Sequence, residues 1–277
     1  MTEITLTGLP TGWCRAIERL VTRRGGLRPV RLFSVAALVE HPTLGGVLID
    51  TGYAPRVLAA SRRWPYRLYR WATPMTAPPA LAAVAQTATR TERVAAVVLT
   101  HLHADHVAGV LDFPDARLLA PRRAWPERSL RGVAAVRRAI LPDLLPPELD
   151  ARVEPFDPAD GGAVDCGALG TGLDLFGDGS MVAVDLPGHA RGQIGVVVHD
   201  RYRGPALVAA DALWDRRALT GGAPSRLTHG IADDARAQAE TVDRIWAWQR
   251  ATGGAVLPTH DLGAWQAWDD ALLAMYR

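Results

Sequence analysis

Thr100-His101-Leu102-His103-Ala104-Asp105-His106 directly follows the apolar, β-prone run Val94-Ala95-Ala96-Val97-Val98-Leu99. The end of a predicted buried strand therefore carries imidazoles and a carboxylate at high density. These are ligand groups that Zn²⁺, Fe²⁺ and Mn²⁺ accept. Because side chains alternate along an extended strand, His101 and His103 are expected on one side. Asp105 and His106 lie past the strand and can curl back toward a second ion, so the stretch predicts bound metal.

Further ligand-type residues stand where other apolar strands are predicted to end. Sites on sheet scaffolds are usually built at such positions. Gly192 and Gly195 let the backbone turn tightly near one of these residues, His189. The candidates are Asp50 after Val47-Leu48-Ile49, His189 after Met181 to Val184, Asp211 after Leu207 to Ala210, and His260 after Val256 to Thr259.

Composition limits the class of protein. The 277 residues are 48% hydrophobic and 22% charged, as in a soluble globular enzyme, and the net charge of +2 calls for no nucleic-acid partner. All 31 basic residues are Arg, which excludes a Schiff-base lysine. Cys14 and Cys166 are too few for a disulfide scaffold or a Cys₄ zinc site. Met1 to Arg24 lacks the order of a signal peptide, and no stretch is apolar enough to span a membrane. We expect a cytoplasmic protein.

Periodicity predicts strands early and late in the chain, each block followed by helices. This order is typical of two sheets packed back to back with helices on the outer faces. Val30 to Glu40 and Val47 to Ile49 read as a hairpin. Further strands are predicted at 94–100, 117–120, 181–184, 194–199, 206–210 and 255–257, and helices within 57–71 and at 81–87, from 107, at 131–140, 234–251 and 265–276.

A long excursion at about 53–92 interrupts the first block of strands. Its aromatic and basic run, Trp64 to Trp71, could form a lid over an acyl substrate, a contact in a homodimer, or a helix that packs two aromatic rings. His41, His199 and His229 have no partners in the sequence and are expected to be structural or exposed. Trp246, Trp248, Trp265 and Trp268 are expected to pack in the core.

The Thr100 to His106 stretch resembles the signature of the metallo-β-lactamase-fold hydrolases. Asp50-Thr51-Gly52, Pro187-Gly188-His189 with Gly195, Asp211 and His260 follow the family pattern in order. The resemblance implies one domain over 1–277 with the αβ/βα four-layer sandwich. It also implies two divalent metal ions, taken as Zn with Fe or Mn as alternatives. One ion would have His101, His103 and His189 as ligands, the other Asp105, His106 and His260, with Asp211 bridging.

The same resemblance implies a reaction. A hydroxide that bridges the two ions would attack a small ester or lactone, with Asp105 available for proton transfer. Asp50 would accept a hydrogen bond from the distal N–H of a histidine ligand and so orient it. The partner is then a small molecule, with neither nucleic acid nor membrane involved.

Within the family, a bridging Asp disfavours a true β-lactamase, and the motifs are most similar to those of N-acyl-homoserine lactonases. In those lactonases a Tyr shortly after the bridging Asp contacts the substrate carbonyl, whereas Trp214 stands here. Tyr53 and Tyr202 are alternatives from elsewhere in the chain. Two other functions stay open: a thioester hydrolase of the glyoxalase II type, which often has a further His where this chain has Leu102, and a non-catalytic carrier that retains the fold.

Overall fold

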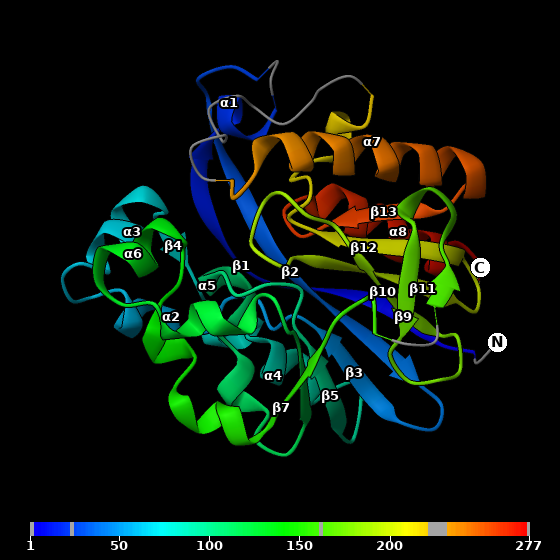
Figure 1. Cartoon of the computed structure of the whole chain (residues 1–277), viewed down its shortest axis with the longest axis horizontal. Helices are drawn as coiled ribbons and strands as arrows, with labels where there is room; N and C mark the ends of the chain where they lie inside the picture. The colour runs from blue at the N-terminus through cyan, green and yellow to red at the C-terminus, as the bar shows by residue number, and fades with distance from the viewer. Residues whose placement is uncertain (1–2, 23–24, 161–162, 221–231, 276–277) are drawn as a thin grey trace.

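The computed structural model describes residues 3–22, 25–160, 163–220 and 232–275. Two β-sheets face each other, with helices outside both (Figure 1). The first sheet has the order β4 (Met75–Thr76), β1 (Thr5–Ile17), β2 (Pro29–His41), β3 (Gly45–Ile49), β5 (Val94–Val98), β6 (Arg117–Pro121), β7 (Val153–Phe156). The second has the order β13 (Ala255–Pro258), β12 (Gly204–Ala210), β11 (Ile194–Asp200), β10 (Met181–Asp185), β9 (Thr171–Asp174), β8 (Ala163–Asp165).

Helices occupy the connections. The α-helices are α1 (Glu18–Val21), α2 (Arg56–Ala60), α3 (Arg67–Ala72), α4 (Ala83–Thr87), α5 (Ala104–Val107), α6 (Gly132–Arg137), α7 (Ala235–Thr252) and α8 (Leu262–Met275). Short 3₁₀ turns lie at Pro79–Leu81, Val110–Asp112, Trp125–Ser129, Pro142–Leu144, Pro147–Ala151, Gly167–Leu169 and Arg216–Ala218. None of the helices in the described ranges has the length and apolar character needed to cross a membrane.

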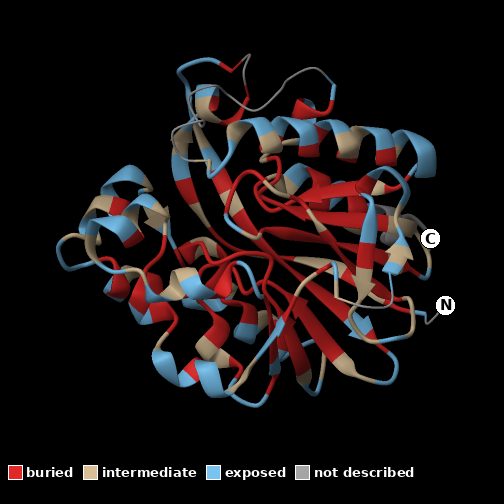
Figure 2. Cartoon of the chain, in the orientation of Figure 1, coloured by how far each residue is buried: buried red, intermediate tan, exposed pale blue. Residues whose placement is uncertain are grey.

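Both faces of the central strands are buried, which explains their continuous apolar runs (Figure 2). In β2, Val35 and Ala37 pack into the core between the two sheets, while Ala36 and Leu38 pack against the helices outside the first sheet. A third cluster lies between the second sheet and α7. The layers are therefore helices, sheet, sheet and helix, which confirms the predicted four-layer sandwich.

Parallel pairing brings the candidate residues together. β3, β5 and β6 run parallel, so the residues that follow β3 and β5 leave the first sheet at one edge. β12 and β13 are also parallel, so Asp211 and His260 leave the second sheet at a common edge. The hairpin of β2 and β3 forms as predicted.

Some elements differ from the sequence-based expectations. β1, a long strand that pairs with β2, was not predicted, because Gly8, Pro10 and Gly12 break its apolar run and the register shifts between Pro10 and Gly12. A helix was predicted from Val107 onward, but α5 spans Ala104–Val107 and ends there, and a 3₁₀ turn follows at Val110–Asp112. Asp105 and His106 therefore lie within α5. The turn-rich stretch before Met181 holds the short strands β8 and β9.

The excursion at 53–92 contributes α2, α3 and α4 to the outer face of the first sheet, and β4 within it pairs with β1. In the aromatic run, Tyr69 is buried, but Trp64 and Trp71 are 61% and 64% exposed. The Arg67 guanidinium lies 5.3 and 5.1 Å from the centroids of these two indole rings. Of the alternatives for this run, the helix that packs two aromatic rings fits Tyr69, which is in the core cluster, and Tyr66, which packs against it. The rings of Trp64 and Trp71 instead stack on Arg67 at the surface.

Most of the histidines and tryptophans predicted to have structural roles are buried or partly buried. His41 is buried and its Nε2 lies 2.7 Å from Asp178 Oδ2, while His199 is half-buried. His229 lies outside the described residues. Trp248, Trp265 and Trp268 are buried, and Trp246 packs partly against the α7 cluster, which confirms their prediction as packing residues.

Candidate metal centre

The predicted ligand residues gather into two groups at the end of the sandwich where β5, β12 and β13 terminate. Within each group, one ligand atom from every residue lies within 4.8 Å of the others. All of these residues except Asp105 are less than 9% exposed, and the Asp105 side chain is 13% exposed. Asp211 belongs to both groups. The first group is His101, His103, His189 and Asp211, and the second is Asp105, His106, Asp211 and His260.

Three of the histidines are anchored through Nδ1. The Nδ1–H of His106 donates to Asp50 Oδ2 at 2.7 Å, and that of His260 donates to the Phe33 carbonyl at 2.6 Å, since both partners can only accept. The Thr100 hydroxyl donates to Asp50 Oδ2 at 2.7 Å, so its oxygen accepts from His101 Nδ1 at 3.1 Å. In each ring Nε2 is left as the nitrogen available to a cation.

The Asp211 carboxylate lies between the two groups. Its Oδ2 is 3.3 Å from His189 Nε2 and 3.1 Å from His260 Nε2, and its Oδ1 is 3.2 Å from His106 Nε2. In the first group, His189 Nε2 also lies 3.0 Å from His103 Nδ1. One buried carboxylate thus approaches histidines of both groups.

Three buried atoms indicate that the donor set suits cations. His101 Nε2, His106 Nε2 and Asp211 Oδ1 have no hydrogen-bond partner in the described part of the chain. A buried polar atom left without a partner costs about 1–3 kcal/mol. His106 Nε2 and Asp211 Oδ1 approach each other without hydrogen-bond geometry, as two ligands of one ion do. Divalent cations bound by nitrogen and carboxylate oxygen would satisfy all three atoms.

Burial and neighbouring charges shift the pKa values of the histidines in opposite directions in the two groups. Burial lowers the pKa of His103 and of His189 to about 3, and lowers that of His101 well below its usual value. These three rings are neutral and present a lone pair, as metal binding requires. The first group is therefore ready for a cation at neutral pH.

The second group is more strongly coupled to carboxylates. Burial disfavours the charged form of His106, but Asp211 and Asp50 outweigh it and raise the pKa of His106 well above the usual value. The pKa of His260 is raised in the same way, mainly by Asp211 against the effect of burial. Burial alone would raise the pKa of Asp211, yet His260 and His106 hold it well below its ordinary range. The negative charge of Asp211 would attract a metal cation, which would replace the protons on His106 and His260.

Tight backbone turns hold these side chains in position. Asp50 has a φ of 59°, and its backbone N–H donates to Val98 O at 2.8 Å, while Thr51 N–H donates to His106 O at 2.7 Å. Gly188 has a φ of 128°, and a Cβ there would lie 2.1 Å from the backbone nitrogen of Gln238 on α7. Only glycine permits this approach, which sets the turn that carries His189.

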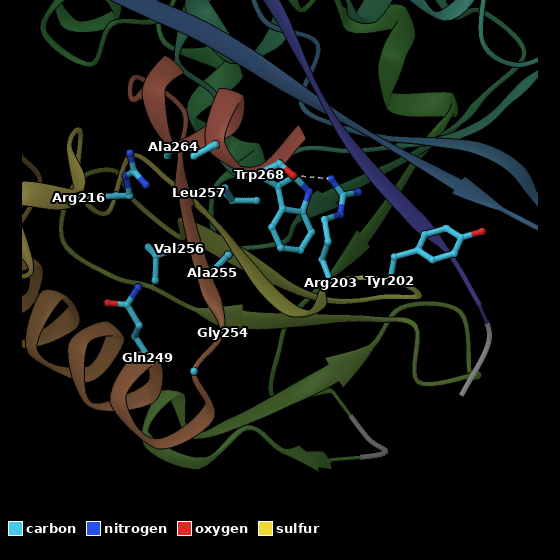
Figure 3. Close-up of a pocket in the computed structure, with 12 residues that line it drawn as sticks. Tyr202, Arg203, Arg216, Gln249, Gly254, Ala255, Val256, Leu257, Ala264 and Trp268 are labelled. Carbon is cyan, nitrogen blue, oxygen red and sulfur yellow. Dashed lines mark hydrogen bonds between the residues drawn. The ribbon is translucent and has the colours of Figure 1, made fainter. Parts of the chain in front are cut away.

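The alternatives to the lactonase Tyr lie in different places. Tyr53 is 1% exposed in the core beside the first sheet, whereas Tyr202 lines a separate cavity of about 580 Å³ between α7, β13 and α8 (Figure 3). No candidate ligand is among the residues lining that cavity. Its wall includes Arg203, whose guanidinium stacks 4.1 Å from the Trp268 ring centroid and donates to the Trp268 carbonyl. Trp214, by contrast, lies against the ligand groups.

Sequence reasoning placed the candidate ligands and Asp50 but missed two supporting groups. The first is the Thr100 hydroxyl, which hydrogen-bonds to both Asp50 and His101. Thr100 belongs to the stretch from Thr100 to His106, but the sequence predicted no role for it. The Phe33 carbonyl that anchors His260 is a backbone atom on a distant strand, so no side-chain pattern identifies it.

A family model described as the metallo-beta-lactamase superfamily matches residues 29–275. The chain belongs to this superfamily. N-acyl homoserine lactonase AttM of Azorhizobium caulinodans is 28% identical over 185 residues, covering 63% of this chain and 61% of that protein. The probable metallo-hydrolase Rv2300c of Mycobacterium tuberculosis is 32% identical over 192 residues, covering 64% and 56%. The chain thus spans about three fifths of the length of these curated relatives.

Solved structures of other proteins share the fold. An N-acyl homoserine lactone hydrolase with N-hexanoyl-L-homoserine bound at its catalytic metal centre matches with a TM-score of 0.73 and 15% identity, over 96% of this chain and 97% of that one. AidC, a dizinc quorum-quenching lactonase, matches with a TM-score of 0.61 and 15% identity, over 94% and 88%. At 15% identity this similarity shows a shared fold only. The two facing sheets with helices outside them are consistent with that fold.

Proposed function

We propose that this superfamily member is a hydrolase that works with two divalent metal ions. The observation that carries the proposal is the pair of buried ligand groups that share Asp211. His101, His103 and His189 would hold one ion, Asp105, His106 and His260 the other, and Asp211 would bridge them. Zinc is the first candidate, because nitrogen-rich sites with carboxylates suit it, although iron and manganese accept the same groups.

Two divalent cations in such a site would supply an activated water and neutralise negative charge on the substrate. In hydrolysis the water oxygen bonds to the acyl carbon, the acyl–oxygen bond breaks, and the departing oxygen takes up a proton. We assign this proton transfer to Asp105, whose Oδ2 lies 3.6 Å from His260 Nε2 and whose side chain is the most exposed of the candidate ligands. Asp50 holds His106 directly and His101 through Thr100.

The proposed substrate is a small lactone or ester. Support comes from the names of the relatives, two of which are N-acyl homoserine lactonases, and from the motif order around Asp50, His189 and His260. The family model also spans most of the proposed single domain over 1–277. A homodimer and a cytoplasmic location remain predictions from the sequence.

The experiment is an activity panel on metal-analysed protein. γ-Lactones with and without an N-acyl side chain, aryl esters and thioesters are assayed before and after chelation, and then after zinc is restored. We expect two equivalents of metal and zinc-dependent opening of lactones. Preferential cleavage of thioesters would favour the glyoxalase II type, and a metal-free protein without hydrolysis would favour the carrier.

A matched pair of variants distinguishes the loss of a metal ligand from a general loss of stability. Asp211→Asn alters the shared carboxylate, whereas Asp178→Asn alters a partly exposed carboxylate that pairs with the buried His41, outside the site. We expect Asp211→Asn to lose metal and turnover and Asp178→Asn to keep both. Equal turnover in the two variants would contradict the proposal.

A further inference from the structure

Asp105 is held differently from the other candidate ligands of the second ion. The rings of His106 and His260 are anchored through Nδ1, and the Asp211 carboxylate lies among three histidines. The Asp105 carboxylate lies 3.6 Å from His260 Nε2, and in the described part of the chain no hydrogen bond to it is found. Its position therefore depends on the backbone that carries it.

Two neighbouring elements fix that backbone within α5. The Thr51 N–H, which follows β3, donates to the His106 carbonyl at 2.7 Å. The Ser34 hydroxyl on β2 donates to the Asp105 carbonyl at 2.6 Å, within the range of good O–H···O hydrogen bonds. Because this carbonyl belongs to Asp105 itself, the bond from Ser34 fixes the residue directly.

The same stretch of β2 also holds the segment that carries His260. The Phe33 carbonyl accepts from His260 Nδ1 at 2.6 Å, and the Val35 N–H donates to the carbonyl just before His260 at 3.2 Å. Ser34 lies between these two residues in the sequence. Three consecutive residues of β2 thus contact ligand segments from opposite sheets, that of Asp105 after β5 and that of His260 after β13.

Ser34 is itself well supported in the core. Ser34 and Thr11 are both 0% exposed, and the Thr11 hydroxyl donates to the Ser34 carbonyl at 2.8 Å. Thr11 Oγ1 in turn accepts from the Tyr53 N–H at 2.9 Å. A Cβ at Gly52, whose φ is 61°, would lie 2.0 Å from Thr11 Oγ1, so this approach requires glycine. The Ser34 hydroxyl therefore reaches Asp105 from a fixed position.

We propose that Ser34 is a positioning residue that sets Asp105 against His260 and so shapes the binding site of the second ion. The inference rests on the proposed two-metal function. Ser34 acts through Asp105, because its hydroxyl is engaged with the backbone carbonyl of that residue. Without the hydroxyl, the carbonyl loses its donor and Asp105 is free to turn away from His260. Outer partners of metal ligands are worth about 10- to 100-fold in metal affinity.

Ser34→Ala tests the inference, because it removes the hydroxyl and leaves the backbone of β2 intact. Zinc affinity is measured by competition with a chromophoric chelator in two backgrounds. His103→Ala removes a ligand of the first ion, and there we expect Ser34→Ala to weaken the remaining second site about 10- to 100-fold. Asp105→Ala leaves the first site, and there Ser34→Ala should change nothing. In the otherwise wild-type chain, Ser34→Ala should weaken one of the two equivalents.

Ser61→Ala is the matched control. Ser61 is also 0% exposed, and its hydroxyl donates to the Val57 carbonyl at 2.7 Å on α2, outside the site. This variant should change the zinc affinity in neither background. Two results overturn the inference: an unchanged affinity of both equivalents in folded Ser34→Ala, or an equal weakening in both backgrounds, which would indicate a general structural defect.

A second variant covers the case in which Ser34→Ala does not fold. Thr11→Val keeps the shape of the side chain and removes the hydroxyl that supports Ser34, so it should weaken the same equivalent by a smaller factor. Unchanged zinc affinity in folded Thr11→Val then overturns the inference. The titration does not depend on turnover. A wild type that binds two equivalents but cleaves nothing in the panel fails as the proposed hydrolase, while the zinc affinities still decide the role of Ser34.

Discussion

Asp50→Asn is the perturbation that best probes how the site is held. The 3% exposed Asp50 carboxylate accepts three hydrogen bonds: Thr100 N–H to Oδ1 at 2.8 Å, and the Thr100 hydroxyl and His106 Nδ1–H to Oδ2, each at 2.7 Å. Asparagine keeps the size of the side chain and tolerates the φ of 59° at this position. It offers only one acceptor oxygen, so a buried donor must face its NH₂ group.

The magnitude follows from these contacts. One buried donor left without an acceptor costs about 1–3 kcal/mol. Loss of the negative charge also makes His106 less basic and frees its ring, and such outer partners are worth about 10- to 100-fold in metal affinity, or about 1.4–2.8 kcal/mol. His101 is affected as well, because its Nδ1 bonds to the Thr100 hydroxyl that Asp50 orients.

The assay is a competition titration with a chromophoric zinc chelator. We expect Asp50→Asn to bind zinc about 10- to 100-fold more weakly than the wild type. Asp178→Asn, which alters an equally short carboxylate–histidine pair with His41, should bind as the wild type does. If both variants are folded by circular dichroism and bind two equivalents with the same affinity, the reasoning about Asp50 is refuted.

Four further outcomes follow from the structure. His103→Ala should lower metal content and reduce turnover to background; elemental analysis and a lactone assay check this, and unchanged values would contradict the ligand assignment. Trp265→Ala, at a 1% exposed site, should cost about 3–5 kcal/mol in the free energy of unfolding measured with urea. Burial raises the pKa of Cys14 from 9.0 to about 12, so unfolding releases a proton between these values. Wild-type stability should then fall by about 1.4 kcal/mol per pH unit above pH 9 relative to Cys14→Ala, and parallel pH profiles would exclude this. Chelation should lower the melting temperature, because ligands that bind only the folded state stabilise it by about 4 kcal/mol at a thousand times their dissociation constant.

The candidate ligand residues could be identified in the sequence because their chemistry is local. Each candidate follows an apolar run, and parallel pairing then brings those strand ends to common edges of the two sheets. Asp50 was assigned the role of orienting a histidine, and the 2.7 Å bond to His106 fits that prediction. Short motifs with metal-ligand spacing carry this information without any knowledge of tertiary contacts.

Other features depend on contacts that no local pattern contains. β1 is stabilised by its pairing with β2, and this tertiary pairing overrides a sequence broken by Pro10 and Gly12. The Phe33 carbonyl meets His260 only after both sheets have formed. Similarly, the sequence marked Trp214 as a departure from the lactonase pattern, but only the fold brings its indole against His189 and His260.

Turnover as a function of bound zinc tests the central claim most directly. Chelated, metal-free protein is titrated with zinc while hydrolysis of an N-acyl homoserine lactone and bound metal are measured together. Two ligand groups that share Asp211 predict no turnover in the metal-free chain and an increase that ends at two equivalents. Full turnover by the metal-free chain, or a two-equivalent complex that cleaves no lactone or ester, would contradict the account.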